Sequence, residues 1–378
     1  MPLLSKDKAI ALRKFWRFFT LYGLMKTLFK SFGRIRPACF SVGSSRRVRD
    51  IGLIGCGQYA FATIGYSVWR VFGNRFIACF DINKENQNSF AKFFNINLNS
   101  NSSSEVIDDE RVKVLYIASN HASHTDYAVE AMQAGKRVYI EKPIAVTMPQ
   151  FKRLAEAYTK TGIPVFAGYN RPFSGAVRQL RKLVDGRDEP MTLACFVSGH
   201  VLGQDHWYRK PEEGTRICGN VGHWLDLAVH MLSWGKLPDQ WQVTVVRSNA
   251  NAPDDDLSIT LVSERNDLVN IVMTSRTEPF EGINETINFQ QHDVIAKIDD
   301  FRKMVIWNGH RLNKFRYWPK DIGHQLAIMQ PFSKINRAWE EVEHSTVLML
   351  FIAEMVSSGK DSEPFSFSEQ LAKAGIVR

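Results

Sequence analysis

The first half of the chain alternates short apolar runs with longer amphipathic stretches. Uninterrupted apolar runs are typical of strands buried on both faces. They occupy residues 50–54, 76–80, 114–118, 138–140 and 164–167. Helical periodicity follows at 57–71 and 125–134, and a capping box with proline in the first turn begins another helix at 147–150. Strands that alternate with helices predict an α/β fold with a Rossmann-like, doubly wound parallel sheet, whose ligand binds at the carboxyl ends of the strands.

The second half of the chain is β-rich and contains two helical segments. We expect strands at 191–198, 242–247, 257–263, 268–274, 285–290 and 304–307. Helices are expected at 222–234 and 334–357, and turn pairs such as Asn308-Gly309 suit hairpins. Residues 97–104 read as a loop. A second, α+β domain is therefore predicted.

A glycine motif follows the first apolar run. Gly55 permits a tight strand-to-helix turn, Gly57 lets the backbone approach a pyrophosphate, and Ala60 is small enough to lie against the strand. With Gln58 and Tyr59 this turn would place free N–H groups against phosphates. An ordinary βα turn explains the motif equally simply when it is taken alone.

The following strand ends support a dinucleotide. Asp81 ends the second run, 26 residues after Gly55, where a carboxylate binds both ribose hydroxyls and repels a 2′-phosphate. NAD is therefore expected as the cofactor and NADP is disfavoured, although Lys84 lies close enough in sequence to soften the preference. The third run leads into Ser119, Asn120 and His124, which belong at the same edge of the sheet.

Candidate catalytic groups come next. Lys142 lies in Glu141-Lys142-Pro143 at the end of the fourth run, and Asp226 and His230 share one face of the helix expected at 222–234. Oxidising an alcohol needs a base that titrates near neutral pH, and a cation stabilises the developing alkoxide. Taken alone, the Asp226/His230 pair reads as a solvated ion pair on a helix.

At this point the chain resembles the glucose–fructose oxidoreductase and inositol dehydrogenase family, written Gfo/Idh/MocA. The resemblance runs from about Val48 to the C-terminus, and three segments carry it. They are 134–143 (A-G-K-R-V-Y-I-E-K-P), 168–171 (G-Y-N-R) and 226–230 (D-L-A-V-H). The resemblance implies a Rossmann domain followed by a domain with a large, open, mostly antiparallel sheet. It also implies that Lys142 and His230 are the catalytic pair, with Asp226 beside them, and that the substrate is a sugar, cyclitol or nucleotide sugar.

The departures from the family pattern concern the substrate. Ala228 replaces the usual glycine, and Ser233 stands where many members carry a second aspartate. The substrate site is expected to include a group of polar and aromatic residues from the second domain: Arg171, Trp207, Arg209, Asn220, His223 and Asp226, with Tyr208 and Arg216 nearby. Arginines bind phosphate or carboxylate in bidentate fashion, and this favours a nucleotide sugar or sugar acid.

No metal site is expected. His200, His206 and His223 are scattered without ligand spacing. The five cysteines (Cys39, Cys56, Cys79, Cys195, Cys218) form no C-x-x-C pair and are expected to be reduced and buried.

The length of 378 residues suits two domains. We expect a basic aromatic arm over 1–47, an NAD-binding domain over 48–170 and a substrate domain over 171–378. The chain carries a net charge of +9, but residues 1–49 alone contribute +11, so the body is nearly neutral and nucleic-acid binding is not expected.

The arm mixes aromatic and basic residues on one predicted helical stretch. Residues 8–36 suggest an interfacial membrane helix, and packing on its own domain or on a neighbouring subunit is the alternative. Charged residues Lys26 and Lys30 exclude a membrane-spanning helix. We expect a cytoplasmic homo-oligomer, which would be membrane-peripheral if residues 8–36 bind a membrane.

The sequence therefore predicts an NAD-dependent oxidoreductase that acts on a carbohydrate hydroxyl or keto group. Two alternatives stay open. One is an NAD-dependent glycoside hydrolase of the same family, and the other is a non-catalytic protein that senses NAD(P).

Overall fold

A computed structural model describes residues 6–37, 40–43, 48–184 and 186–376. Its first half forms a six-stranded parallel sheet in the order β3-β2-β1-β4-β5-β6. The strands are β1 (Ile51–Ile54), β2 (Phe76–Phe80), β3 (Leu98–Asn99), β4 (Val114–Ile117), β5 (Arg137–Ile140) and β6 (Val165–Ala167). The order reverses at β1, so the crevice between β1 and β4 is the switch point where such sheets bind ligands.

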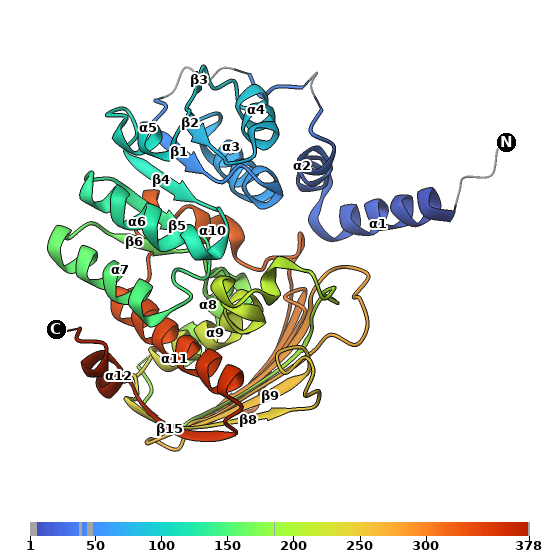
Figure 1. The fold of residues 1–378 in the computed structure, drawn as a ribbon. Helices are drawn as coiled ribbons and strands as arrows, with labels where there is room; N and C mark the ends of the chain where they lie inside the picture. The colour runs from blue at the N-terminus through green and yellow to red at the C-terminus, as the bar shows by residue number, and fades with distance from the viewer. Residues whose placement is uncertain (1–5, 38–39, 44–47, 185, 377–378) are drawn as a thin grey trace.

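Helices cover both faces of this sheet, as Figure 1 shows. They are the π-helical turn η1 (Ala60–Gly65), α3 (Tyr66–Phe72), α4 (Lys84–Phe93), α5 (Ser103–Asp108), α6 (His124–Gln133) and α7 (Met148–Thr161). The cap predicted for α7 is confirmed, because the Gln150 backbone N–H donates to the Thr147 hydroxyl at 3.3 Å. The loop prediction for 97–104 was wrong in part, since β3 lies inside it and α5 begins at Ser103.

The second half forms a nine-stranded sheet in the order β14-β13-β12-β11-β7-β10-β9-β8-β15. Only the pair β7 and β10 is parallel. The strands are β7 (Met191–Ser198), β8 (Gln240–Arg247), β9 (Leu257–Ser263), β10 (Leu268–Thr274), β11 (Asn284–Gln291), β12 (Val294–Asp299), β13 (Lys303–Asn308), β14 (Arg311–Arg316) and β15 (Ser362–Ser366). The predicted fold class is therefore confirmed, and the whole first sheet falls within 48–170 and the whole second sheet within 171–378.

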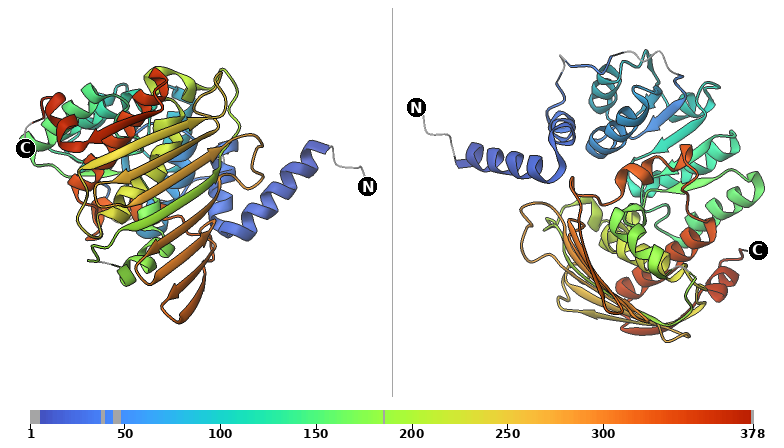
Figure 2. Two further views of the ribbon diagram at one scale, coloured as in Figure 1. Left: turned by 90° about the horizontal axis from the view of Figure 1, so that it is seen from below. Right: turned by 180° about the vertical axis from the view of Figure 1, so that it is seen from behind.

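The curved sheet has one covered face and one open face. Helices α8 (Gly175–Val184), α9 (Gly222–Leu232) and α11 (Trp339–Ser358) fill its inner side and share one hydrophobic core with it (Figure 1). The outer side, seen in the left view of Figure 2, exposes Phe196, Val246 and Trp307. The expected helix at 334–357 begins five residues late. The short helices α10 (His324–Ile328) and α12 (Phe367–Lys373) complete the domain.

The arm forms two helices, α1 (Lys6–Tyr22) and α2 (Leu24–Ile35), joined at Gly23. Both views in Figure 2 show α1 extending away from the body. Its end is nevertheless fixed to the second domain, because the Trp318 indole N–H donates to the Thr20 carbonyl at 2.9 Å and the Lys320 backbone N–H to the Leu21 carbonyl at 2.8 Å. α2 packs on η1, with Phe29 buried among aromatic side chains of the Rossmann domain. Arm residues therefore bridge the two domains.

Within the described residues, no helix is long and apolar enough to cross a bilayer. Cys56, Cys79, Cys195 and Cys218 are buried free thiols, as expected, while Cys39 lies outside the described residues. Membrane contact by residues 8–36 and assembly into a homo-oligomer stay predictions.

Candidate active site at the carboxyl edge of the first sheet

The glycine turn has the shape that a dinucleotide requires. Gly55 has φ +87°, and a Cβ there would lie 2.4 Å from the Ala118 backbone, so only glycine fits. A Cβ on Gly57 would meet nothing within 4 Å, which leaves open space in front of the turn. Gln58 and Tyr59 begin the helix and Ala60 is buried against the sheet. These residues fit the pyrophosphate of a dinucleotide.

Asp81 stands at the end of β2 beside this turn. One carboxylate oxygen accepts from the Cys56 backbone N–H at 2.6 Å and the other from the Asn83 N–H at 2.7 Å. These bonds fix the carboxylate at the rim where a ribose would lie. The arm adds Arg36, whose guanidinium donates to the Cys56 carbonyl at 2.7 Å and to the Ser89 hydroxyl at 3.1 Å. The Asp81 carboxylate and the Arg36 guanidinium therefore both lie beside the glycine turn, where the adenosine half of a dinucleotide would bind.

The end of β4 is closed by a residue that sequence reasoning missed. Glu213 accepts from the Asn120 side-chain amide at 2.7 Å and from the Ala122 backbone N–H at 3.1 Å. Its backbone carbonyl also lies 2.9 Å from Nδ1 of His121. Burial, with the Lys142 charge as a smaller cause, lowers the pKa of His121 to about 2. Ninety-three residues separate Asn120 from Glu213 in the chain, so no local pattern could reveal the contact.

His124 joins this loop to the Lys142 segment. Its Nδ1 lies 2.8 Å from the Pro143 carbonyl and its Nε2 lies 3.1 Å from the Ser119 carbonyl. The ring is buried, and burial lowers its pKa. The Ser119 hydroxyl lies 2.8 Å from that of Ser123. These contacts shape the turn and make His124 a positioning residue.

Lys142 lies where β5 ends, before a cis peptide bond to Pro143. Its Nζ donates to the Gly219 carbonyl at 2.8 Å and lies 5.8 Å from the centre of the Tyr208 ring. The side chain is buried, and the bond to Gly219 is its one hydrogen bond within the described residues. The preceding Glu141 is also buried, and burial raises its pKa to about 7.

Two histidines near Lys142 have a ring nitrogen free. His223 lies one helical turn after Gly219, and the Nδ1 atoms of His223 and His324 are buried without a hydrogen-bond partner among the described residues. Burial lowers the pKa of both rings well below its ordinary value, and the charges of Arg171 and Lys142 add to that shift. Both imidazoles are therefore neutral near pH 7, and each has one ring nitrogen open to a ligand.

Asp226 and His230 lie in a different environment. Asp226 accepts two bonds from Arg337, at 2.7 and 2.8 Å, and His230 Nδ1 lies 2.6 Å from Oε1 of Glu341. Nε2 of His230 accepts from the Trp234 indole N–H at 3.3 Å. Within the described residues, the side-chain bonds of Asp226 and His230 lead to α11, to Arg337 just before it and to Trp234.

Asp226 and His230 do share one face of α9, as predicted. That face bonds α11 and the residue Arg337 before it, and not Lys142. Arg337 also bonds Glu341 at 2.6 Å, so the four side chains form one buried ionic network between the two helices. This geometry gives no support to a catalytic role for Asp226 or His230, or to substrate binding by Asp226. The imidazole of the same helix that has a free ring nitrogen is His223, two turns earlier.

The predicted substrate arginines are paired as well. Arg171 donates to both oxygens of buried Glu285 at 2.7 and 2.9 Å, and the Trp224 indole N–H reaches the same carboxylate at 2.7 Å. Because these donors are already used, Arg171 has lost the bidentate face on which the phosphate hypothesis rested.

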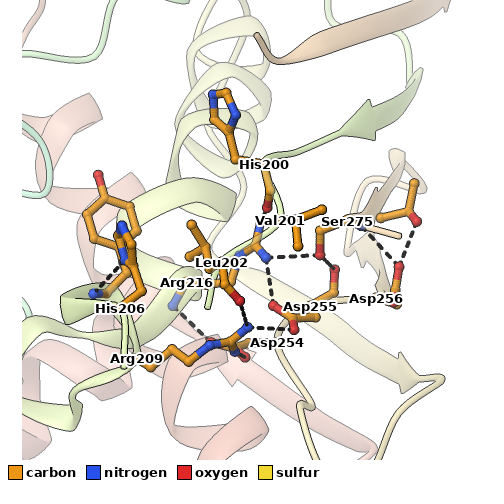
Figure 3. A network of polar contacts seen from close by, with 12 residues as sticks. His200, Val201, Leu202, His206, Arg209, Arg216, Asp254, Asp255, Asp256 and Ser275 are labelled. Carbon is orange, nitrogen blue, oxygen red and sulfur yellow. Dashed lines mark hydrogen bonds and ion pairs between the residues drawn. The ribbon is translucent and has the colours of Figure 1, made fainter. Parts of the chain in front are cut away.

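Arg209 and Arg216 share the carboxylate of Asp255, at 2.8 and 2.6 Å (Figure 3). Arg209 also donates to the Leu202 carbonyl, and Arg216 to the His200 carbonyl and the Ser275 hydroxyl. The cluster ties the loop before α9 to β9 and β10, and this structural use argues against substrate binding by Arg209. Trp207, in contrast, is part-exposed and packs on His121 at 4.6 Å, and Asn220 lies part-exposed beside Gly219.

Within the described ranges, no group of three or more His, Cys, Asp or Glu side chains could hold a metal ion. The site is therefore described by a dinucleotide cradle, one buried lysine and neutral imidazoles.

Comparison with known proteins agrees with this geometry. Residues 49–169 match the sequence profile described as the GFO_IDH_MocA oxidoreductase family with an NAD-binding Rossmann fold. Residues 49–169 therefore belong to the Gfo/Idh/MocA family of NAD-binding Rossmann domains. Oxidoreductase P35 of Formosa agariphila is 25% identical over 184 residues, 48% of this chain and 57% of that protein. Inositol 2-dehydrogenase of Azotobacter vinelandii is 30% identical over 159 residues, 41% of this chain and 47% of that protein.

The chain thus aligns with about half the length of these curated relatives. Solved structures extend the likeness to the whole fold. An NAD-binding oxidoreductase from Klebsiella pneumoniae has a TM-score of 0.68 at 16% identity, covering 85% of this chain and 99% of its own. The WlbA dehydrogenase of Bordetella pertussis, in complex with NADH and UDP-GlcNAcA, has a TM-score of 0.65 at 19% identity, covering 85% and 99%. At this identity the likeness concerns the fold.

Proposed function

We propose that the protein is an NAD(P)-dependent oxidoreductase that acts on a carbohydrate hydroxyl, with NAD as the preferred cofactor. The observation that carries the proposal is a buried Lys142 held at the Gly219 carbonyl, with the open Nδ1 of His223 one helical turn further on and a turn that fits a dinucleotide at the same sheet edge. The family relationship supports the reaction class, and the WlbA complex supports a nucleotide-sugar or sugar-acid substrate by analogy.

The nicotinamide, when bound, supplies the hydride acceptor or donor. Lys142 would place its ammonium beside the reacting oxygen and stabilise negative charge as the hydroxyl loses its proton. His223 would accept that proton, because the neutral ring has a free nitrogen. Burial keeps the pKa of His223 low and the charges of Arg171 and Lys142 lower it further, and the developing alkoxide would offset those two charges.

The cofactor site would be formed by the glycine turn and the ends of β2 and β4: Gly55, Gly57, Gln58, Tyr59, Asp81, Ser119 and Asn120. Glu141 would lie next to this site. Trp207 and Asn220 are the part-exposed residues that stay proposed for substrate binding. His124 holds the turn. Four residues first proposed for the site would instead stabilise the folded structure through ion pairs: Asp226, His230, Arg171 and Arg209.

The test is a matched comparison of variants in a screen of inositol, free sugars, sugar acids and nucleotide sugars with NAD and NADP. Lys142→Met and His223→Ala should each lower turnover roughly 100-fold or more, with NADH affinity nearly unchanged. His230→Gln is the control, and it should retain turnover per folded molecule. Loss of turnover in His230→Gln with normal turnover in His223→Ala would restore the original assignment.

The two alternatives give other results. A glycoside hydrolase would release sugar without net NADH, since its cofactor is regenerated. An NAD(P) sensor would bind the cofactor and turn over none of the substrates.

A further inference from the structure

The arm helices form one wall of a cavity at the mouth of the cleft. Phe18, Tyr22, Lys26 and Lys30 line it from the arm, in a space of about 540 Å³. A cavity of this size is in the range that holds a small-molecule ligand. The wall is anchored, since a Cβ on Gly33 of α2 would lie 3.3 Å from the Ala62 Cβ of η1.

The opposite walls come from both domains. The Rossmann domain contributes the glycine-turn residues Gln58 and Tyr59, while the second domain contributes Tyr208 and His324. The ring centres of Tyr59 and His324 lie 6.0 Å apart. The cavity therefore lies where the arm and both domains meet.

Lys26 and Lys30 are the cations that face this space. Their ammonium groups lie 4.6 Å from the centre of the Tyr22 ring and 3.8 Å from that of Phe18. No hydrogen bond or ion pair to either ammonium is recorded among the described residues. Burial lowers the pKa of both to about 8; Asp321 opposes that shift at Lys26, while Arg34 and Lys26 add to it at Lys30. Two partly buried cations without an anionic partner are costly unless an anion binds.

The cavity borders the candidate active site through two shared residues, Tyr208 and His324. Tyr208 lines the cavity, and its ring also lies over Lys142 at 5.8 Å. Burial lowers the pKa of His324, and the charges of Lys26 and Lys142 both lower it further. A ligand held by the arm lysines could thus extend toward the reacting end of the cleft.

We propose that the arm completes the substrate site, with Lys26 and Lys30 binding the phosphate or carboxylate group of an anionic carbohydrate substrate. This rests on the proposed function and deepens it, because the substrate class then follows from the arm and not from Arg171, Arg209 or Arg216, which already bond carboxylates of the protein itself. An uncharged sugar would leave both lysines unpaired.

The test measures anion binding to full-length protein saturated with NADH, so that the cofactor's own phosphate site is filled. Calorimetric titration with inorganic pyrophosphate should show binding, and the double variant Lys26→Gln/Lys30→Gln should weaken it at least tenfold. Lys26→Arg/Lys30→Arg keeps both charges and should retain binding. Lys14→Gln is the matched control on α1, where its ammonium lies over Phe280 at 5.7 Å and outside this cavity.

Glucuronate in place of pyrophosphate distinguishes the two anions: binding of glucuronate that needs the same lysines assigns a sugar acid, and binding of pyrophosphate alone assigns a diphosphate. The proposal is overturned if neither anion binds at millimolar concentration or if the double glutamine variant binds as the wild type does. It is also overturned if the double variant weakens NADH as much as it weakens pyrophosphate, since the lysines would then serve the cofactor. Lys142→Met should bind pyrophosphate normally, so this result stands apart from any failure of the proposed catalysis.

Discussion

Two polar clusters of the second domain and its border differ in how completely their bonds are used. In the cluster of Arg209, Arg216 and Asp255, charges of opposite sign lie within 2.6 to 2.8 Å and backbone carbonyls take further donors. Around Lys142, the Nδ1 atoms of His223 and His324 lack hydrogen-bond partners among the described residues. The first arrangement stabilises loops, while the second leaves bonding capacity for a ligand. The comparison teaches that arginines already bonded to carboxylates hold the loops together, whereas the two open imidazoles lie where a ligand can bond them.

The largest expected effect comes from breaking a fully paired network. Arg337→Met removes the partner of buried Asp226 and Glu341 and should lower the free energy of unfolding by about 3–5 kcal/mol. Urea unfolding monitored by tryptophan fluorescence measures the loss. Turnover per folded molecule should change little, and selective loss of turnover without loss of stability would place Asp226 in the chemistry after all.

The next effect concerns Glu141, a buried carboxyl beside the site. Burial raises its pKa from 4.5 to about 7, so ionisation above that pH costs stability that is fully present below pH 4.5. Glu141→Gln mimics the protonated form and should be more stable than the wild type by about 2–3 kcal/mol at pH 8. The difference should vanish near pH 4.5. Equal unfolding midpoints at both pH values would show that the carboxyl keeps its ordinary pKa.

Asp81 is the intermediate case, with both oxygens bonded to backbone N–H groups but free lone pairs toward the rim. Wild-type protein should bind NADH at least tenfold more tightly than NADPH, a difference of about 1.4 kcal/mol. Asp81→Asn should narrow the gap. Fluorescence titration with NADH and NADPH measures the difference in affinity. Tighter binding of NADPH would contradict the prediction and would indicate that Arg36 binds the 2′-phosphate.

The smallest effect tests the arm's anchor. Phe29→Leu leaves a gap among the Tyr66, Trp69 and Phe93 rings and should cost about 1 kcal/mol in the free energy of unfolding. Trp16→Leu is the control on exposed α1 and should have no effect. Identical stability of both variants would mean that α2 does not pack on the body in solution.

The fold was predictable where local pattern and burial coincide. Strands β1, β2, β4 and β5 are wholly or almost wholly apolar because helices cover both faces, so their runs stand out in the sequence. The missed strands β14 and β15 lie at the two edges of the large sheet, where exposed polar residues and Pro364 are tolerated. β12 was missed because Lys297 and Asp299 point to the open side of the sheet.

The candidate site was predictable at strand ends and not beyond them. Gly55, Asp81 and Lys142 follow strands, and parallel topology alone brings them to one edge. Helix spacing placed Asp226 and His230 on one face, but periodicity cannot say which neighbour that face meets. Glu213, His324 and the arm lysines enter through contacts between segments distant in sequence, which only the tertiary structure supplies.

Gly23 has a mechanical consequence. Thr20 and Leu21, just before it, are bonded to the second domain, whereas Phe29, just after it, is packed into the first. With φ +79° the glycine adopts a conformation that other residues rarely share. A change in the angle between the two domains would therefore have to alter the backbone around Gly23 or detach one end of the arm.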